Sequence, residues 1–175
     1  MMIDATLHAE RDREVERLVR AAQRGDQLAM AELMGLLAPS VARWCGPIAL
    51  QHGPDAAQES LIAILRGLPG LRDPSALFGW ARAIAIREAV RIAKRERGRA
   101  GDPLGELPAR GDPLLGVEIR DTLARLSPEH RAVLVLRDLE GLDEQTASRV
   151  LAVAPGTVKS RLARARAGFR KAWQR

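Results

Sequence analysis

LSPEHRAVLVLRDLEGLDEQTASRVLAVAPGTVKSRLARARAGFRKAW, residues 126–173, decides the fold of the second half of the chain. Its last part has a Pro at residue 155, which fits the first position of a helix because its missing N–H costs nothing there. An apolar stripe then recurs at helical spacing; it consists of Val158, Leu162, Ala165, Phe169 and Trp173. Basic residues fill much of the remaining surface, and neither Asp nor Glu occurs between residues 154 and 173.

The residues before this basic helix predict a helix-turn-helix. Ser127 and Pro128 read as an N-cap and first position of a helix that runs to about Leu139 and stops at Gly141. Asp143 can cap a second short helix, and residues 152–154 form a tight turn before the basic helix. A helix, a short turn and a basic helix together favour DNA binding in the major groove. The alternative is a solvated basic helix that closes a small bundle.

Composition supports an all-α protein with a polyanionic partner. The chain has 175 residues, of which 28 are Lys or Arg and 22 are Asp or Glu, so its formal net charge is +6. Aromatic residues make up 3% and Tyr is absent. We see no apolar run of about 20 residues that would span a bilayer and no signal-peptide core near the N-terminus. The single Cys45 excludes an internal disulfide, and we expect a cytoplasmic protein with no membrane insertion.

The first half predicts further helices, at residues 9–24, from Asp26 onward with an interruption at Pro39, and at residues 55–66. The last of these sets Ile62 among polar residues on an outward face, a pattern that indicates a protein-binding surface. That face consists of Asp55, Glu59, Ile62 and Arg66, with Gln58 at its edge. A solvated face with one stray apolar residue is an equally good interpretation from physics alone.

A second basic row follows a Gly- and Pro-rich loop at residues 67–75. On the helix after this loop the row consists of Trp80, Ile84, Arg87, Arg91, Lys94 and Arg95. Aromatic rings can stack on unpaired bases while guanidinium groups hold phosphates. The alternative is that the aromatic residues anchor the core and the basic ones only solubilise the helix. We favour the core for Phe78 and nucleic acid for the basic row.

Residues 98–116 are rich in Gly and Pro and show no hydrophobic periodicity, so we interpret residues 98–117 as a flexible linker. The predicted fold is therefore all-α, with two small helical domains at residues 9–97 and 118–175, the second ending in the helix-turn-helix.

Signals of catalysis are missing from the sequence. His8, His52 and His130 have no spaced partner suited to a metal. Asp55 and Glu59 lie one turn apart without a basic or nucleophilic partner nearby in sequence. We predict no enzymatic activity, no metal and no cofactor.

Two sets of motifs resemble the extracytoplasmic-function (ECF) family of bacterial RNA polymerase sigma factors. The C-terminal half, with LSP at 126–128, LEGL at 139–142 and GTVKSRL at 156–162, closely resembles the family's region 4. Ala154 departs from the capping Ser that the family often has. The N-terminal half resembles region 2 through DAAQE at 55–59 and FGWARAIA at 78–85, although Leu65 replaces a common Trp and Ala81-Arg82 replace Leu-Tyr.

This resemblance implies a protein that binds core RNA polymerase and directs promoter recognition, DNA melting and transcription initiation. It implies polymerase contacts at the β′ clamp, through Asp55, Gln58, Glu59 and Ile62, and at the β flap. The basic row on residues 80–95 would contact the −10 element. Contacts with the −35 element would come from Thr157, Lys159, Ser160, Arg161 and Arg164. The resemblance also implies an anti-sigma factor that holds the protein inactive.

Two other functions stay open at this stage. One is a helix-turn-helix regulator that binds duplex DNA without replacing a sigma factor; the second basic row and the region 2 motifs argue against it. The other is a basic helical adaptor that binds proteins or membranes, which would show no promoter preference.

Overall fold

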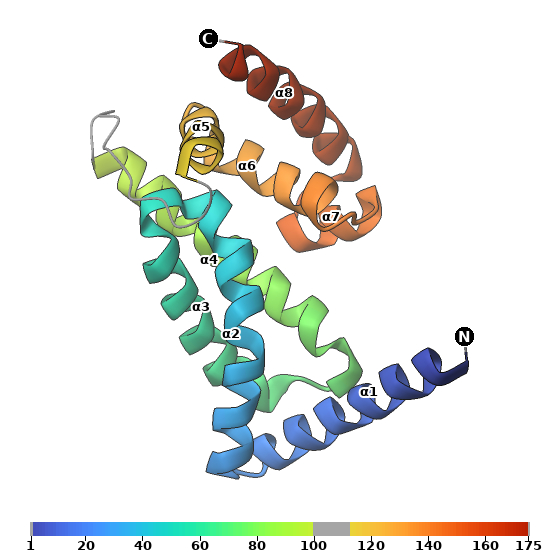
Figure 1. The fold of residues 1–175 in the computed structure, drawn as a ribbon. Coiled ribbons are helices and arrows are strands. Elements are labelled where there is room, and N and C mark those ends of the chain that lie inside the picture. Colours follow the sequence, from blue (N-terminus) through green and yellow to red (C-terminus); the bar gives the residue numbers. More distant parts are fainter. Residues whose placement is uncertain (1, 100–112, 175) are drawn as a thin grey trace.

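The computed structural model describes residues 2–99 and 113–174, and all regular elements in these ranges are helical (Figure 1). The all-α prediction is confirmed, while the part of the predicted linker at residues 100–112 lies outside the described residues. The first half comprises α1 (Met2–Gln23), α2 (Gln27–Ala49), η1 (Leu50–His52), α3 (Gly53–Gly67), η2 (Leu68–Gly70), η3 (Pro74–Ala76) and α4 (Leu77–Arg99). The second half comprises α5 (Pro113–Ala124), α6 (Pro128–Leu134), the π-helical turn η4 (Val135–Leu139), α7 (Glu144–Leu151) and α8 (Pro155–Trp173).

The first half is a bundle of α2, α3 and α4, with α1 packed against α2 and the η2–η3 segment (Figure 1). Gly25 ends α1 with a φ of +93°, a conformation that glycine adopts without strain. Asp26 then caps α2, because its side chain accepts hydrogen bonds from the N–H groups of Leu28 and Ala29. The fully buried centre of this bundle includes Leu33, Leu37, Val41, Ile64, Ile86 and Ile92.

Helix α2 corrects the predicted interruption at Pro39. The helix runs unbroken from Gln27 to Ala49 with Pro39 and Pro47 inside it. A proline removes one hydrogen bond of the helix ladder and crowds the preceding turn. Here Leu37 and Val41, on either side of Pro39, are completely buried, so packing of the helix on α3 and α4 outweighs the local loss.

This region contains a longer apolar stretch than the sequence analysis recognised. Within Gln27–Gly70 an 18-residue window reaches a mean hydropathy of 1.3, enough by length and composition to cross a membrane. The window is 39% buried inside the fold, and core helices of soluble proteins pass the same test. The stretch is therefore only a weak indication of a membrane span.

The two halves pack directly on each other rather than standing apart. Helix α4 contacts α6 and α7, and α2 contacts α6 and η4 (Figure 1). Helices also take up both ends of the segment 98–117 that the sequence predicted as linker: α4 continues to Arg99 and α5 begins at Pro113. Pro113 suits a helix start because that position needs no N–H donor, which explains why a Pro-containing segment can begin a helix.

Candidate nucleic-acid interface

The predicted helix-turn-helix is present, and its ends are set by local hydrogen bonds. The Ser127 side chain accepts from the His130 N–H at 3.2 Å and caps α6. Asp143 accepts from the Thr146 N–H at 2.8 Å and caps α7. Ala152 closes α7 in the left-handed region, with a φ of 52°, and starts the turn into α8. These bonds fix where α6 and α7 begin, whereas α8 begins after Ala154 without a side-chain cap.

Helix α8 presents the polar face that the sequence predicted. Val158, Leu162 and Ala165 are buried against α6 and α7, while Lys159, Ser160 and Arg164 are exposed. Thr157 and Arg161 are partly buried. The first turn carries no acid, so the free N–H groups and partial positive charge of the helix start are available to an anion. Thr157, Ser160, Arg161 and Arg164 therefore lie within about 100° of one another around α8, whereas Lys159 lies about 160° away from Thr157 and Arg161.

Two arginines of α8 have different surroundings. Arg164 reaches only its own helix, where Nε donates to the Ser160 carbonyl at 3.3 Å and Nη2 to the Ser160 hydroxyl at 3.3 Å. Arg166 instead makes a two-point contact with Asp138, at 3.2 Å from Nε and 2.6 Å from Nη2. That hydrogen bond, together with the Asp138 charge, raises the pKa of Arg166. The Arg166 side chain is thus held by Asp138, whereas the Arg164 side chain can turn outward and contact a phosphate.

The second basic row lies along α4, and its residues differ in exposure. Arg87, Arg91, Lys94 and Arg95 are exposed, whereas Trp80 and Ile84 are half-buried and pack against the core. The Trp80 ring approaches Gly67 closely, so that a Cβ at Gly67 would lie 3.0 Å from the indole. Trp80 therefore has one side fixed to the protein, as a stacking platform for a base would require.

The prediction that Phe78 anchors the core is wrong. Its side chain is 37% exposed. Leu77 and Ala81, one turn apart on α4, occupy the inward positions and are completely buried. Phe78 follows Leu77 by about 100° around the helix, which turns its ring out of the core.

The face of α3 proposed to bind protein is exposed at Asp55, Gln58 and Glu59, and Ile62 is partly buried beside them. An open, mainly apolar groove of about 460 Å³ adjoins this face between α2 and α3. Gln58 and Ile62 line it together with Met34, Ala38, Ala42, Pro54, Ala57, Leu61 and Leu65. Met34, which is partly buried and packs against the core, also contributes to this groove. An apolar groove with an acidic border suits a partner helix that has basic residues beside an apolar stripe.

Residues that join the two halves were not found from the sequence. Arg131 and Glu140 are charged side chains that the fold buries, at 6% exposure for Arg131 and 11% for the Glu140 side chain. Burial lowers the pKa of Arg131 to about 10. A charged residue in an amphipathic helix looks solvent-facing in sequence, and only the packing of α6 on α2 shows otherwise.

Other chemistry is limited in the described part of the chain. Residues 2–99 and 113–174 contain no group of three or more His, Cys, Asp or Glu that could hold a metal. Burial raises the pKa of Cys45 to about 11, against a weaker opposite effect of its hydrogen bond with Ser60. Cys45 is therefore a protonated core residue at neutral pH and a poor nucleophile.

Comparison with known proteins agrees with this geometry. A family model described as "Sigma-70, region 4" matches residues 116–167, which contain the helix-turn-helix. The fold is shared with two solved structures at 22% sequence identity. One is RpoE of Bartonella quintana in complex with the anti-sigma factor NepR, with a TM-score of 0.66 over 82% of this chain and 96% of that one. The other is CnrH in complex with the cytosolic domain of CnrY, with a TM-score of 0.64 over 90% of this chain and 95% of that one.

Sequence relatives place the chain more narrowly. The ECF RNA polymerase sigma factor ShbA of Streptomyces griseus is 32% identical over 164 residues, covering 81% of this chain and 86% of ShbA. The ECF sigma-E factor of Salmonella typhimurium is 28% identical over 172 residues, covering 85% of this chain and 88% of that factor. A 33% identical match to SigM of Mycobacterium tuberculosis covers 65% of this chain and 60% of SigM. The chain belongs to the family of ECF RNA polymerase sigma factors, which is not a class of enzymes.

Proposed function

We propose that this chain binds core RNA polymerase in the cytoplasm and directs it to promoters, where it assists melting and initiation. We also propose that an anti-sigma factor holds the chain inactive. The observation that carries the proposal is the acid-free α8 surface, presented by a capped helix-turn-helix in a chain of the ECF family. The anti-sigma factor is supported by RpoE of Bartonella quintana, which shares the fold and is in complex with the anti-sigma factor NepR.

The proposal divides the work between the two halves. In the second half, Thr157, Lys159, Ser160, Arg161 and Arg164 contact the −35 element, mostly through phosphates, with base readout from a few of them. On α4, the basic row of Trp80, Ile84, Arg87, Arg91, Lys94 and Arg95 holds the −10 element. Two modest contacts on one chain gain from effective concentration when both DNA elements are correctly spaced.

The polymerase contact is assigned to the acidic face of α3 and the adjoining groove, with the β′ clamp as the partner, and the β flap is assigned to the second half. Asp55 and Glu59 supply charge at the edge of the groove, while Gln58 and Ile62 line it. Charges at the edge of an interface mainly guide association, and the apolar groove supplies the buried contact.

Charge reversal tests this assignment. Glu59→Arg should abolish co-purification with core polymerase, because it sets a like charge against a basic partner. Thermal stability and helical content should be unchanged, because Glu59 is exposed. Glu32→Arg is the matched control, since Glu32 is exposed on α2 and lies two residues from the groove residue Met34, on the far side of that helix. Retention of core binding by the Glu59 variant would show that α3 is not the polymerase surface.

A regulator that binds duplex DNA alone is the second candidate, and the structure offers one observation for it. The helix-turn-helix is complete within the second half, so its α8 surface needs no polymerase to be formed. Such a regulator would leave the set of polymerase subunits unchanged, and the same co-purification would show no chain bound to the core enzyme.

A further inference from the structure

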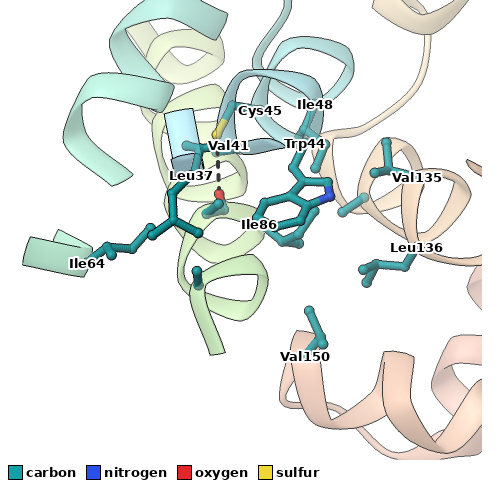
Figure 2. Packing of buried hydrophobic residues seen from close by; sticks show 14 of the residues in the cluster. Leu37, Val41, Trp44, Cys45, Ile48, Ile64, Ile86, Val135, Leu136 and Val150 are labelled. Carbon is teal, nitrogen blue, oxygen red and sulfur yellow. Dashed lines mark hydrogen bonds between the residues drawn. The ribbon is translucent and has the colours of Figure 1, made fainter. Parts of the chain in front are cut away.

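The turn between α3 and α4, residues 67–76, has a defined shape although it contains two glycines and two prolines. Buried residues recur there at every third position and alternate with exposed ones; they are Leu68, Leu71, Pro74 and, at the start of α4, Leu77. The helices on either side are anchored in the core, where Ile64 of α3 and Ile86 of α4 are completely buried (Figure 2). The turn itself has only the two short helical pieces η2 and η3, so contacts with its surroundings must set its position.

Gln23, the last residue of α1, ties this turn to the first helix. Its Nε2 donates to the carbonyl of Leu68 at 3.0 Å and to the carbonyl of Leu71 at 2.8 Å. A side-chain amide nitrogen has two hydrogens, and both are thus used by the same short turn. Gln23 is partly buried, so water would replace these bonds only in part if the amide were removed.

A weaker tie lies one helical turn earlier on α1. Asp73 begins η3, because its Oδ1 accepts hydrogen bonds from the Ser75 N–H at 3.0 Å and from the Ser75 hydroxyl at 2.7 Å. The bonds from Ser75 lower the pKa of Asp73, and the charge of Arg20 on α1 lowers it further. Attraction between exposed charges contributes little to stability, so the Gln23 amide is the stronger of the two ties.

The turn begins against the aromatic ring that is proposed to stack on an unpaired base. Leu68 follows Gly67 directly, and a Cβ at Gly67 would lie 3.0 Å from Cζ2 and 3.4 Å from Cη2 of Trp80. The Gly67 backbone therefore forms a wall beside the six-membered ring of the indole. A gap of about 0.5–1 Å forfeits a quarter to a half of the attraction between two atoms, so a small displacement of the turn would loosen the ring.

We propose that Gln23 is a positioning residue for the −10 contact. Its two hydrogen bonds hold the turn at residues 67–76, so that Gly67 keeps the Trp80 ring in the orientation that stacks on an unpaired base. Gln23 acts through the turn and contacts no DNA itself. This inference rests on the proposed −10 role of α4 and adds to it a residue of α1.

Hydrogen exchange of the full chain tests the tie without DNA or polymerase. Gln23→Glu keeps the shape of the side chain but loses its donors at neutral pH, whereas Gln23→Lys keeps donors. The reporters are the N–H groups of Leu71 and Ala76, which donate to the carbonyls of Leu68 and Asp73 at 3.1 Å. Their exchange should be about tenfold faster in Gln23→Glu, because the turn opens more often, and close to the parent rate in Gln23→Lys.

Asp26→Ala is the matched control. It removes two hydrogen bonds, from the N–H groups of Leu28 and Ala29, only three positions after Gln23, but it leaves both Gln23 bonds in place. It should lower the stability of the chain without changing the exchange of the two reporters. Unchanged exchange in Gln23→Glu, or an equal rise in Asp26→Ala, would overturn the tie.

Binding of unpaired DNA tests the consequence. The chain in complex with core polymerase is titrated with a fluorescent single strand that carries the −10 region of a promoter selected by run-off transcription. Gln23→Glu and Trp80→Ala should each weaken binding by about tenfold, within the range of one stacked base, and Gln23→Lys should retain the parent affinity. The double variant should lose no more than Trp80→Ala alone, because Gln23 acts through the ring. Binding of core enzyme and of a −35 duplex should be unchanged in Gln23→Glu.

Three results would overturn the positioning role: losses that multiply in the double variant, an equal loss of −35 duplex binding, or full single-strand affinity in Gln23→Glu. If the parent complex binds no single strand, the −10 assignment of α4 fails and the positioning role fails with it, while the exchange result still decides the tie.

Discussion

Arg164 offers a quantitative test of the α8 surface. Replacement by Ala removes an exposed guanidinium that reaches only Ser160 in the folded chain. Each phosphate contact contributes about 0.9 to the slope of log K against log salt for duplex DNA. The loss of one contact should therefore lower the slope by about 0.9 and weaken binding in 0.1 M salt by about eightfold. Between 50 and 200 mM salt, the variant should lose about 3.5-fold less affinity than the parent chain.

The control is Arg166→Ala on the same helix. Residues 164 and 166 are about 200° apart around α8, and Arg166 is held by Asp138. The assay is a salt titration of promoter binding by the chain in complex with core polymerase. Arg166→Ala should leave the slope within error, although it breaks an exposed ion pair that contributes about 0–1 kcal/mol to folding. An unchanged slope for Arg164→Ala, or an equal drop for both variants, would refute the assignment of Arg164 to a phosphate.

Three further predictions concern stability, measured as the free energy of unfolding in urea. Gly53→Ala should destabilise the chain by about 1–3 kcal/mol, because the new Cβ lies 3.0 Å from the backbone of α2. Gly35→Ala, which meets nothing within 4 Å, should instead gain about 0.5–1 kcal/mol; losses of similar size in both would contradict the close approach of α2 and α3. Ala154→Ser should add about 1 kcal/mol by capping α8, and a loss would show that the turn cannot accept the cap. Burial, followed by the charge of Arg164, lowers the pKa of His130 below its ordinary 6.5, so the unfolded chain takes up this proton first and stability should fall as the pH drops below about 6.5. His130→Gln should reduce that fall, and an identical pH dependence of the variant would exclude His130 as a contributor.

Local signals explain why much of the helical architecture could be predicted. Ser127 and Asp143 were expected as caps, and each side chain accepts a backbone hydrogen bond at the start of its helix. The apolar stripe of α8 likewise follows from its spacing, and its first members are buried. Capping and amphipathic spacing involve residues within a few positions of one another, so a single sequence contains the required information.

Features that depend on distant contacts were missed. Pro39 looks like a helix break locally, yet α2 continues because its flanking residues are buried by α3 and α4. The packing of the two halves on each other was not predicted either. Arg131 and Ile48 are separated by 83 positions, and the sequence near one residue does not indicate a contact with the other. Phe78 was misplaced for a related reason, since the choice between it and Leu77 as the inward residue depends on how α4 is rotated in the bundle.

The most direct test of the account is run-off transcription with purified bacterial core polymerase on a promoter library, with and without this chain. We predict new, discrete start sites that depend on the chain, that share two DNA elements at fixed spacing, and that disappear with Glu59→Arg but not with Glu32→Arg. No chain-dependent initiation by a folded chain and an active cognate core enzyme would contradict the sigma function, and duplex binding alone would then support the regulator.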